Sequence, residues 1–67
     1  MKNNIERRRK ELDMTQQQLA AALGVSRQTV ISLESGRYNP SLILAHRLAV
    51  VFGLKIEDIF EFEEETK

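Results

Sequence analysis

Polar side chains recur at helical spacing between residues 27 and 35, and their types could bind the bases of a nucleic acid. If Val30 and Leu33 face inward on a helix of 3.6 residues per turn, the other positions face outward. The outward residues are Gln28, Ile31, Ser32 and Ser35, with Arg27 at the N-terminal edge. Arginine can bond bidentately to guanine, glutamine to adenine, and serine to either base. The residues that we predict to contact bases are Arg27, Gln28, Ile31 and Ser32.

Ile31 leaves two interpretations open, because it is an apolar side chain on a face that should be wet. It could contact a thymine methyl group, or it could be partly buried at the rim of the core. The polar residues around it are weak indications one by one, since such residues cover most protein surfaces. The prediction depends on their position in the first turns of a helix, which DNA-binding helices of this kind use to contact bases.

Two helix starts with a short turn between them place these residues. Thr15 and Gln18 have the spacing of a capping box, in which side chain and backbone bond reciprocally. Ser26 is the predicted cap of the next helix, and Gly24 in the intervening turn can take a positive φ. Residues 15–36 therefore read as a helix-turn-helix, a motif that can place its second helix in a DNA major groove.

The hydrophobic pattern over the whole chain predicts one all-α domain, residues 1–67, of five helices. We expect the helices at about residues 4–13, 16–23, 27–35, 42–52 and 56–60. Ile5 and Leu12 form the expected inward stripe of the first helix. The expected inward face of the fourth consists of Leu42, Ala45, Leu48, Ala49 and Phe52. The alternation from Phe60 to Glu63 predicts a short strand, which we expect to pair in a small antiparallel sheet with residues 2–4.

Charge is segregated along the chain although the formal net charge is zero. Residues 1–54 carry eight basic and four acidic side chains, a net charge of +4, whereas residues 55–67 carry two basic and six acidic ones, a net charge of −4. A basic body suits contact with DNA. The acidic tail, residues 61–67, could point away from the DNA or could serve only to keep a small protein soluble.

Several classes of function are disfavoured by what the sequence lacks. It has no cysteine and one histidine, His46, so neither a thiolate metal site nor a set of nucleophile, base and orienting group can be assembled. We therefore expect no enzyme, no cofactor, no metal and no small-molecule effector. The longest apolar stretch, residues 48–54, is far below the roughly 18 residues of a membrane span. With no apolar run after Met1, this predicts a cytoplasmic protein without a signal peptide.

Phosphate contacts are expected at the edges of the motif. Backbone N–H groups that are free at a helix start can hold a phosphate oxygen, which indicates Gln16, Gln17 and Ser41. Arg37 and Tyr38, in the loop after the motif, offer a charge and a hydroxyl. Such contacts set register and affinity but carry no sequence information.

At these residues the chain resembles the phage-repressor/Cro-like (XRE) helix-turn-helix proteins, particularly small single-domain prokaryotic members. The matching segments are T-Q-Q-Q-L-A, L-G-V-S-R-Q-T-V, L-E-S-G-R-Y-N-P-S-L and G-L-K-I-E-D-I-F. The resemblance covers about residues 5–60. It implies a five-helix lambda-repressor-like bundle that binds a two-fold operator as a dimer, at the nucleoid of a prokaryote or in a phage system.

The resemblance also implies roles for single residues. Arg27, Gln28 and Ser32 match its base-contacting positions, and Ser35 and Arg37 match backbone-contacting ones. Gln16 matches a residue that touches phosphate and steadies the residue at Gln28. Arg9 and Glu34 match an ion pair that bridges the first helix to the end of the third. We interpret that pair as a positioning device, because a buried ion pair adds little net stability.

Two positions depart from the family pattern. Lys55 stands where Ser or Thr often caps the last helix, so we expect that cap to be lost and the helix to depend on a neighbour. Asp13 stands where Gly commonly ends the first helix. Aspartate tolerates the left-handed conformation better than most residues, so we expect the turn to form with some strain.

The fourth helix is more apolar than one inward face explains. Ile43, Leu44, Val50 and Val51 lie beside or off the expected stripe, and with Phe62 they could form an exposed patch. Such patches often mark interfaces. We predict a homodimer with Leu44, Val51 and Phe62 as candidate interface residues. The rival interpretation is that the last helix and the tail cover them.

The sequence thus favours a transcriptional regulator, most simply a repressor, that binds double-stranded DNA with the helix at residues 27–35 in the major groove. The alternative is an antitoxin-type or other protein-interaction module on the same fold. The short segment after Phe60 disfavours a dedicated toxin-binding extension.

Overall fold

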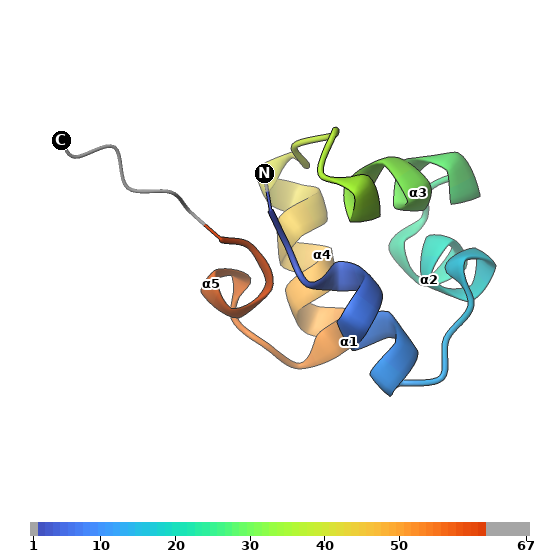
Figure 1. Cartoon of the computed structure of the whole chain (residues 1–67), viewed down its shortest axis with the longest axis horizontal. Coiled ribbons are helices and arrows are strands. Elements are labelled where there is room, and N and C mark those ends of the chain that lie inside the picture. Colours follow the sequence, from blue (N-terminus) through green and yellow to red (C-terminus); the bar gives the residue numbers. More distant parts are fainter. Residues whose placement is uncertain (1, 62–67) are drawn as a thin grey trace, which may run out of the picture.

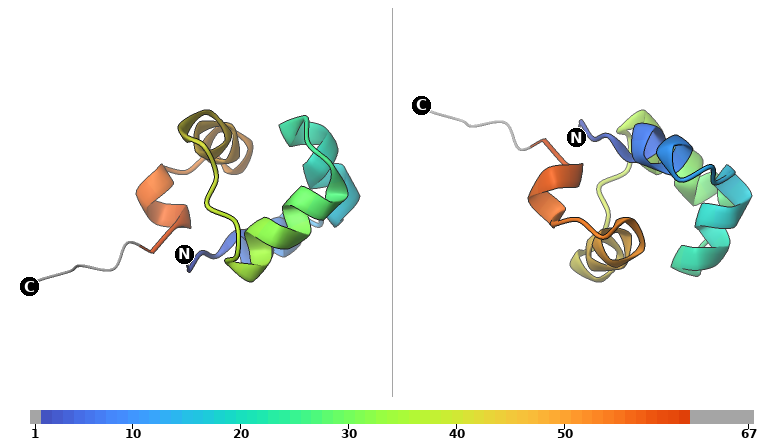
Figure 2. Two further views of the ribbon diagram at one scale, coloured as in Figure 1. Left: turned by 90° about the horizontal axis from the view of Figure 1, so that it is seen from above. Right: turned by 90° about the horizontal axis from the view of Figure 1, so that it is seen from below.

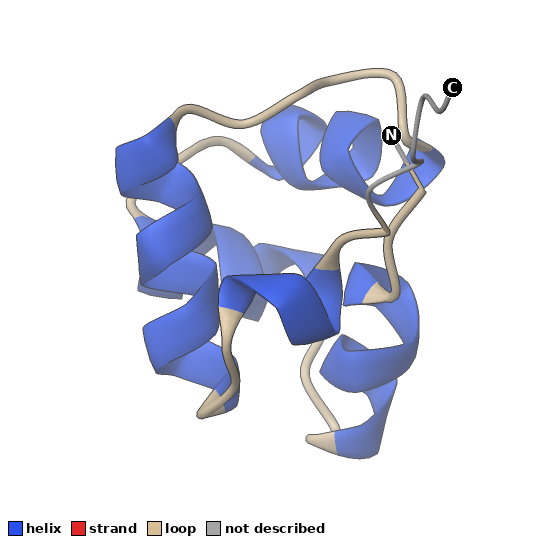
Figure 3. Ribbon diagram, turned by 90° about the vertical axis from the view of Figure 1, so that its left-hand side faces the viewer, coloured by secondary structure: helices blue, strands red, loops and turns tan. Residues whose placement is uncertain are grey.

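The computed structural model describes residues 2–61, which form five α-helices joined by loops (Figures 1 and 3). The helices are α1 Ile5–Glu11, α2 Gln16–Leu23, α3 Arg27–Ser35, α4 Leu42–Phe52 and α5 Ile56–Ile59. The predicted all-α class is confirmed, and each helix end lies within two residues of its expected place. No helix in this part of the chain has the length and apolar character to span a membrane.

Hydroxyl side chains begin the three central helices. Thr15 Oγ1 accepts from the backbone N–H of Gln18 at 3.0 Å, and Gln18 Oε1 accepts from that of Thr15 at 2.8 Å. The predicted capping box is therefore present. Ser26 and Ser41 cap α3 and α4 with single bonds from the N–H three residues on, at 3.2 and 3.1 Å. These local bonds replace water at N–H groups that a helix start leaves free.

Four residues of 2–61 use the left-handed backbone region, and two of them lie in the turns on either side of α2. Gly24, which ends α2, has φ +75°, as expected for a glycine at this position. Asp13, between α1 and α2, has φ +57° and is the only non-glycine residue of 2–61 with a positive φ. The expectation that Asp13 adopts this conformation is confirmed, and its side chain makes the strain smaller than most others would.

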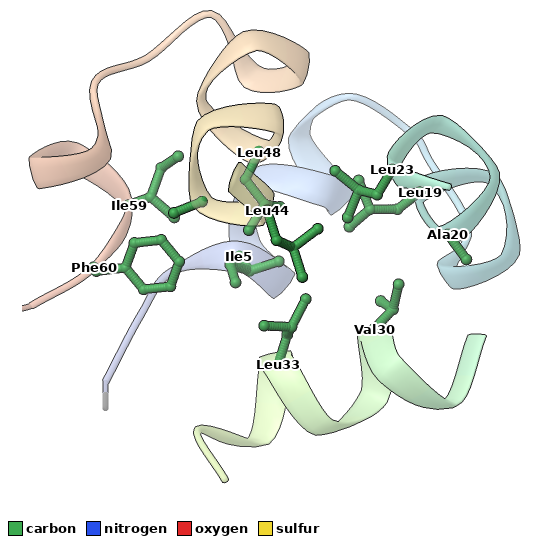
Figure 4. Close-up of a cluster of buried hydrophobic side chains, with 11 residues drawn as sticks. Ile5, Leu19, Ala20, Leu23, Val30, Leu33, Leu44, Leu48, Ile59 and Phe60 are labelled. Atoms are coloured by element: carbon green, nitrogen blue, oxygen red, sulfur yellow. The ribbon is translucent and has the colours of Figure 1, made fainter. Parts of the chain in front are cut away.

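The core lies where all five helices meet (Figure 4). Its largest fully buried side chains are Ile5, Leu19, Leu23, Val30, Leu33, Leu48 and Ile59. Val30 and Leu33 point from α3 into the space between the helices in Figure 4, so their predicted inward orientation is confirmed. Each Å² of apolar surface removed from water stabilises the fold by about 25 cal/mol, and this burial is the main favourable term in folding.

Three predictions of side-chain position were wrong, two on α4 and one at the end of α1. Leu42 of α4 is 79% exposed, whereas Leu44 is only 6% exposed and belongs to the core, so Leu44 is unavailable as an exposed interface residue. Because α4 is apolar on several sides, its hydrophobic pattern does not define its rotation. Leu12 is 51% exposed and follows the last turn of α1, where Arg9 takes the inward position instead.

The two termini pair as predicted as far as the structure describes them. Asn3 and Phe60 form an isolated antiparallel bridge, and the N–H of Glu61 donates to the carbonyl of Lys2 at 2.8 Å. The N-terminal segment and the end of α5 lie side by side in both views of Figure 2. Phe62 and Glu63, the rest of the expected strand, lie outside the described residues.

α5 lacks a side-chain cap from Lys55 and depends on a neighbouring segment, as predicted. The Lys55 side chain makes no capping bond. The Asp58 carboxylate accepts from the Lys55 N–H at 3.2 Å, and the Asn4 side chain donates to the Asp58 carbonyl at 2.8 Å. This short helix is therefore held by the N-terminal segment.

A pair of leucines on α4 tests its rotation. Leu48→Ala is expected to lower the free energy of unfolding by about 2–5 kcal/mol, because it leaves a cavity in the core. Leu42→Ala, the matched control at a position that is exposed in the single chain, should change it by less than about 0.5 kcal/mol when both variants are measured at a concentration low enough to keep the protein monomeric. Urea denaturation followed by circular dichroism measures both. Equal losses for the two variants would show that the rotation is wrong.

Candidate nucleic-acid interface

The outward face of α3 brings together the residues predicted to contact bases. Arg27 and Gln28, in the first turn, are exposed, while Val30 and Leu33 on the opposite side are fully buried. Ile31 and Ser32 are half-buried. The partial burial of Ile31 matches one of its two interpretations and still leaves part of the side chain accessible.

A hollow beside α3 adds the following loop to this surface. It is lined by Ser26, Gln28, Thr29, Ser32 and Tyr38. Tyr38 is 43% exposed, so its ring forms a wall of the hollow and still faces solvent. Ser26 and Thr29 hydrogen-bond to each other through their hydroxyls, 3.1 Å apart. The sequence interpretation missed Thr29, although its position between Gln28 and Ser32 on the same helix was a usable signal.

The predicted Arg9–Glu34 ion pair is present and ties three segments together. Arg9 Nε lies 2.6 Å from Glu34 Oε2, and Nη2 donates to Oε1 at 3.4 Å. Arg9 Nη1 also donates to the carbonyl of Met14 at 2.8 Å. Gln16 Nε2 donates to Glu34 Oε1 at 3.1 Å. One carboxylate thus holds α1, the start of α2 and the end of α3 in a fixed relation.

Burial makes this pair an orienting device. The side chains of Arg9 and Glu34 are 9% and 6% exposed. Hydrogen bonding to Glu34 raises the pKa of Arg9 above its ordinary value, and desolvation opposes that rise. The guanidinium is charged, as in any protein arginine. Planar guanidinium and carboxylate groups bond well in few orientations, so the pair restricts how α3 can rotate against α1.

The residues predicted to contact phosphates lie around this surface in different states. Gln17, Arg37 and Ser41 are exposed, as is Tyr38. Their distribution over α2, the α3–α4 loop and the start of α4 would allow contact on both sides of α3. One N–H of the Gln16 amide donates to Glu34, which leaves the second N–H of that group for a phosphate oxygen.

Ser35 is poorly prepared for the contact that the resemblance implied. Its hydroxyl donates to the Ser32 carbonyl at 2.9 Å and accepts from the Arg37 N–H at 3.4 Å. A phosphate oxygen needs a donor, so Ser35 would have to give up its bond within α3. Ser35 is exposed at the last turn of α3, beyond the residues that would enter a groove first.

Two further side chains brace the motif and were missed by the sequence interpretation. Asn3 Nδ2 donates to the carbonyl of Leu33 near the end of α3, at 2.8 Å. Arg47 Nη1 donates to the carbonyl of Leu23 at the end of α2, at 3.1 Å. Both acceptors are backbone atoms, far away in the sequence, so no residue pattern could have predicted the pairing.

The arrangement is suited to binding an extended polyanion. Exposed guanidinium and amide groups lie on the outward face of α3, and exposed polar residues lie in the loop that follows it. Within residues 2–61, no group of three or more His, Cys, Asp or Glu side chains is placed to hold a metal ion.

Comparison with known proteins supports this description. A helix-turn-helix family model matches residues 5–59. The chain belongs to this family. The match spans the whole motif and all five helices, in agreement with the resemblance to XRE-type proteins that the sequence showed.

The similarity to known relatives covers almost the entire chain. It is 56% identical to an uncharacterized HTH-type transcriptional regulator of Methanothermobacter thermautotrophicus, with 97% of this chain and 96% of that one covered. It is 43% identical to the uncharacterized HTH-type transcriptional regulator YgzD of Bacillus subtilis, with 98% and 100% covered. The crystal structure of a transcriptional regulator from Listeria innocua is similar, with a TM-score of 0.82 and 28% identity. That comparison covers all of this chain and 66% of the other.

The ion pair can be tested against an exposed pair on α1. Glu34→Ala is expected to lower the free energy of unfolding by about 3–5 kcal/mol, because it leaves the Arg9 charge buried without a partner. Lys10→Ala breaks the exposed Lys10–Glu6 pair, 3.1 Å apart, and should cost less than about 1 kcal/mol. Urea denaturation compares them. A Glu34→Ala loss no larger than that of the control would contradict the orienting role.

Proposed function

We propose that this protein is a sequence-specific DNA-binding transcriptional regulator that inserts α3 into the major groove. The observation that carries the proposal is the exposure of Arg27 and Gln28 at the N-terminal end of α3, with Val30 and Leu33 buried behind them. A helix docked through these residues presents the two donors of an arginine to a guanine edge, and the donor and acceptor of a glutamine to an adenine edge. Ser32, half-buried one turn further on, reads a neighbouring base, and Ile31 packs on a thymine methyl group.

Flanking residues position the domain on the sugar-phosphate backbone. The phosphate contacts in this proposal come from Gln16, Gln17, Arg37, Tyr38 and Ser41. Arg37 and Tyr38 belong to the loop that borders α3, so they reach the strand beside the groove that α3 occupies. Free N–H groups at the starts of α2 and α4 add partial positive charge at both sides. These contacts set affinity, and the α3 residues set sequence preference.

In this proposal two copies bind a two-fold operator, whose half-site centres are about 34 Å apart, one helical turn of DNA. Because Leu44 is buried, the α4 side of the proposed interface consists of other residues. These are Leu42, Ile43 and Val50, which are 79%, 68% and 66% exposed, with half-buried Val51 beside them. A second copy would remove these side chains from water. Phe62, the other candidate, lies outside the described residues. A dimer seated on its operator excludes other proteins from that DNA, so repression is the simplest outcome, at the nucleoid in the cytoplasm.

Two variants separate base reading from phosphate contact. An operator is first selected from random DNA with the wild-type protein. Gln28→Ala is then expected to weaken operator binding by about 10-fold to 100-fold, with little effect on unrelated DNA, because one bidentate base contact is lost. Arg37→Ala, the matched control, should weaken both DNAs about equally and reduce the salt slope by about 0.9. Equal losses on both DNAs for Gln28→Ala would remove it from the reading residues.

The dimer is tested by sedimentation equilibrium at micromolar concentration. The expected species has twice the 7.7 kDa chain mass. Ile43→Glu should return it to the monomer, because a charge would be buried in the interface. Leu12→Glu places the same charge at an exposed leucine of α1 and should leave the dimer intact. A 7.7 kDa species for the wild-type protein would defeat this part of the proposal.

A further inference from the structure

Arg47 makes a contact that neither the core nor the proposed DNA surface explains. It lies on α4, yet its Nη1 atom donates to the carbonyl oxygen of Leu23, the last residue of α2, at 3.1 Å. The two residues are 24 positions apart in the sequence. This bond therefore joins α4 to the helix-turn-helix unit at the turn itself.

The acceptor is one of the carbonyl groups that a helix end leaves without an intrahelical partner. The turn that ends α2 satisfies earlier carbonyls, since the Val25 N–H bonds to Ala20 and the Gly24 N–H to Ala20 and Ala21. The Arg47 guanidinium reaches the carbonyl of Leu23. Its positive charge also lies at the negative end of the α2 dipole, which favours it there.

The guanidinium also lies against the turn. A Cβ atom built on Gly24 would be 3.5 Å from Arg47 Nη1, which is ordinary contact distance. Gly24 has φ +75°, and this left-handed residue sets the direction in which the chain leaves α2 for α3. α3 begins at Arg27, three residues later. A group that holds the turn in place therefore acts on the end of α3 that carries Arg27 and Gln28.

The opposite end of α3 has its own polar ties. Glu34 bonds to Arg9, and the Leu33 carbonyl accepts from Asn3. Near the N-terminal end of α3, Val30 supplies apolar packing, which resists separation but allows some rotation. The bond from Arg47 ties the turn before that end to α4.

We propose that Arg47 is a positioning residue for DNA reading, which holds the α2–α3 turn against α4 and so sets the angle at which Arg27 and Gln28 meet the bases. The inference rests on the proposed DNA-binding function. Through Arg47, the turn is fixed relative to α4, whose N-terminal Ser41 is a proposed phosphate anchor. Loss of the bond lets the reading end of α3 shift while the phosphate contacts and the core remain.

Three substitutions at this position separate the roles that Arg47 could play. Arg47→Met keeps the apolar stem without a donor, Arg47→Gln keeps a shorter neutral donor, and Arg47→Lys keeps a charged donor. Arg7→Met, at an exposed arginine of α1, is the matched control for loss of charge. Each variant is measured for affinity to the selected operator and to unrelated DNA over a range of salt, and for its urea unfolding midpoint.

Arg47→Met is expected to lower operator affinity about 10-fold, the scale of one charged hydrogen bond, while affinity for unrelated DNA and the salt slope stay unchanged. Arg47→Lys should restore most of the loss, and Arg47→Gln less. In nuclear magnetic resonance spectra of Arg47→Lys and Arg47→Met, the amide signals of residues 24–28 should move more in the methionine variant. If Arg47→Met fails to fold, Arg47→Gln takes its place.

Two results would overturn the proposal. Equal loss on both DNAs with a salt slope reduced by about 0.9 would make Arg47 a phosphate contact. A lower unfolding midpoint with an unchanged ratio of operator to unrelated affinity would make its role structural only. The proposed function itself fails only if the wild-type protein prefers no DNA sequence. That result is distinct from the two above, which require a wild-type protein that prefers its operator.

Discussion

The geometry of the bundle depends on one buried charge pair, Arg9 with Glu34. Apolar contacts among the five helices supply the free energy of folding, but they are weakly directional, and helices packed only by them can rotate or slide at small cost. Two planar ions that share a dry environment tolerate little change of angle. Because Gln16 bonds to the same carboxylate, one group defines the relation among α1, α2 and α3. Taking two charges out of water is costly, so the pair adds little net stability. Its effect is to fix the orientation of α3.

The outward face of α3 follows from this constraint together with the core. Once Val30 and Leu33 are buried and Glu34 is held, Gln28 has no direction left but outward. The first turn of α3 is then both the most accessible part of the helix and the part nearest the Gly24 turn. Polar bonds lie near both ends of α3 in this chain of 67 residues, one set around Glu34 and one at the turn before Arg27.

A small domain also leaves apolar surface that it cannot cover by itself. α4 contributes Leu48 to the core and still exposes Leu42, Ile43 and Val50. The pairing of Asn3 with Phe60 uses the N-terminal segment to cover α5 and the end of α3 rather than this face.

Hydrogen bonds between residues three or four positions apart depend on local sequence alone, so the sequence was enough to predict them. The caps at Thr15 and Ser26, the Gly24 turn and the rotation of α3 all follow from local spacing, because each depends on neighbours along one helix. The Arg9–Glu34 pair was reached only through family resemblance. The burial of Leu44, the exposure of Leu12 and the bond from Arg47 to Leu23 could not be read from spacing at all. They depend on which helices lie alongside and at what angle, and an apolar helix such as α4 satisfies its own backbone equally well in several rotations until its neighbours select one.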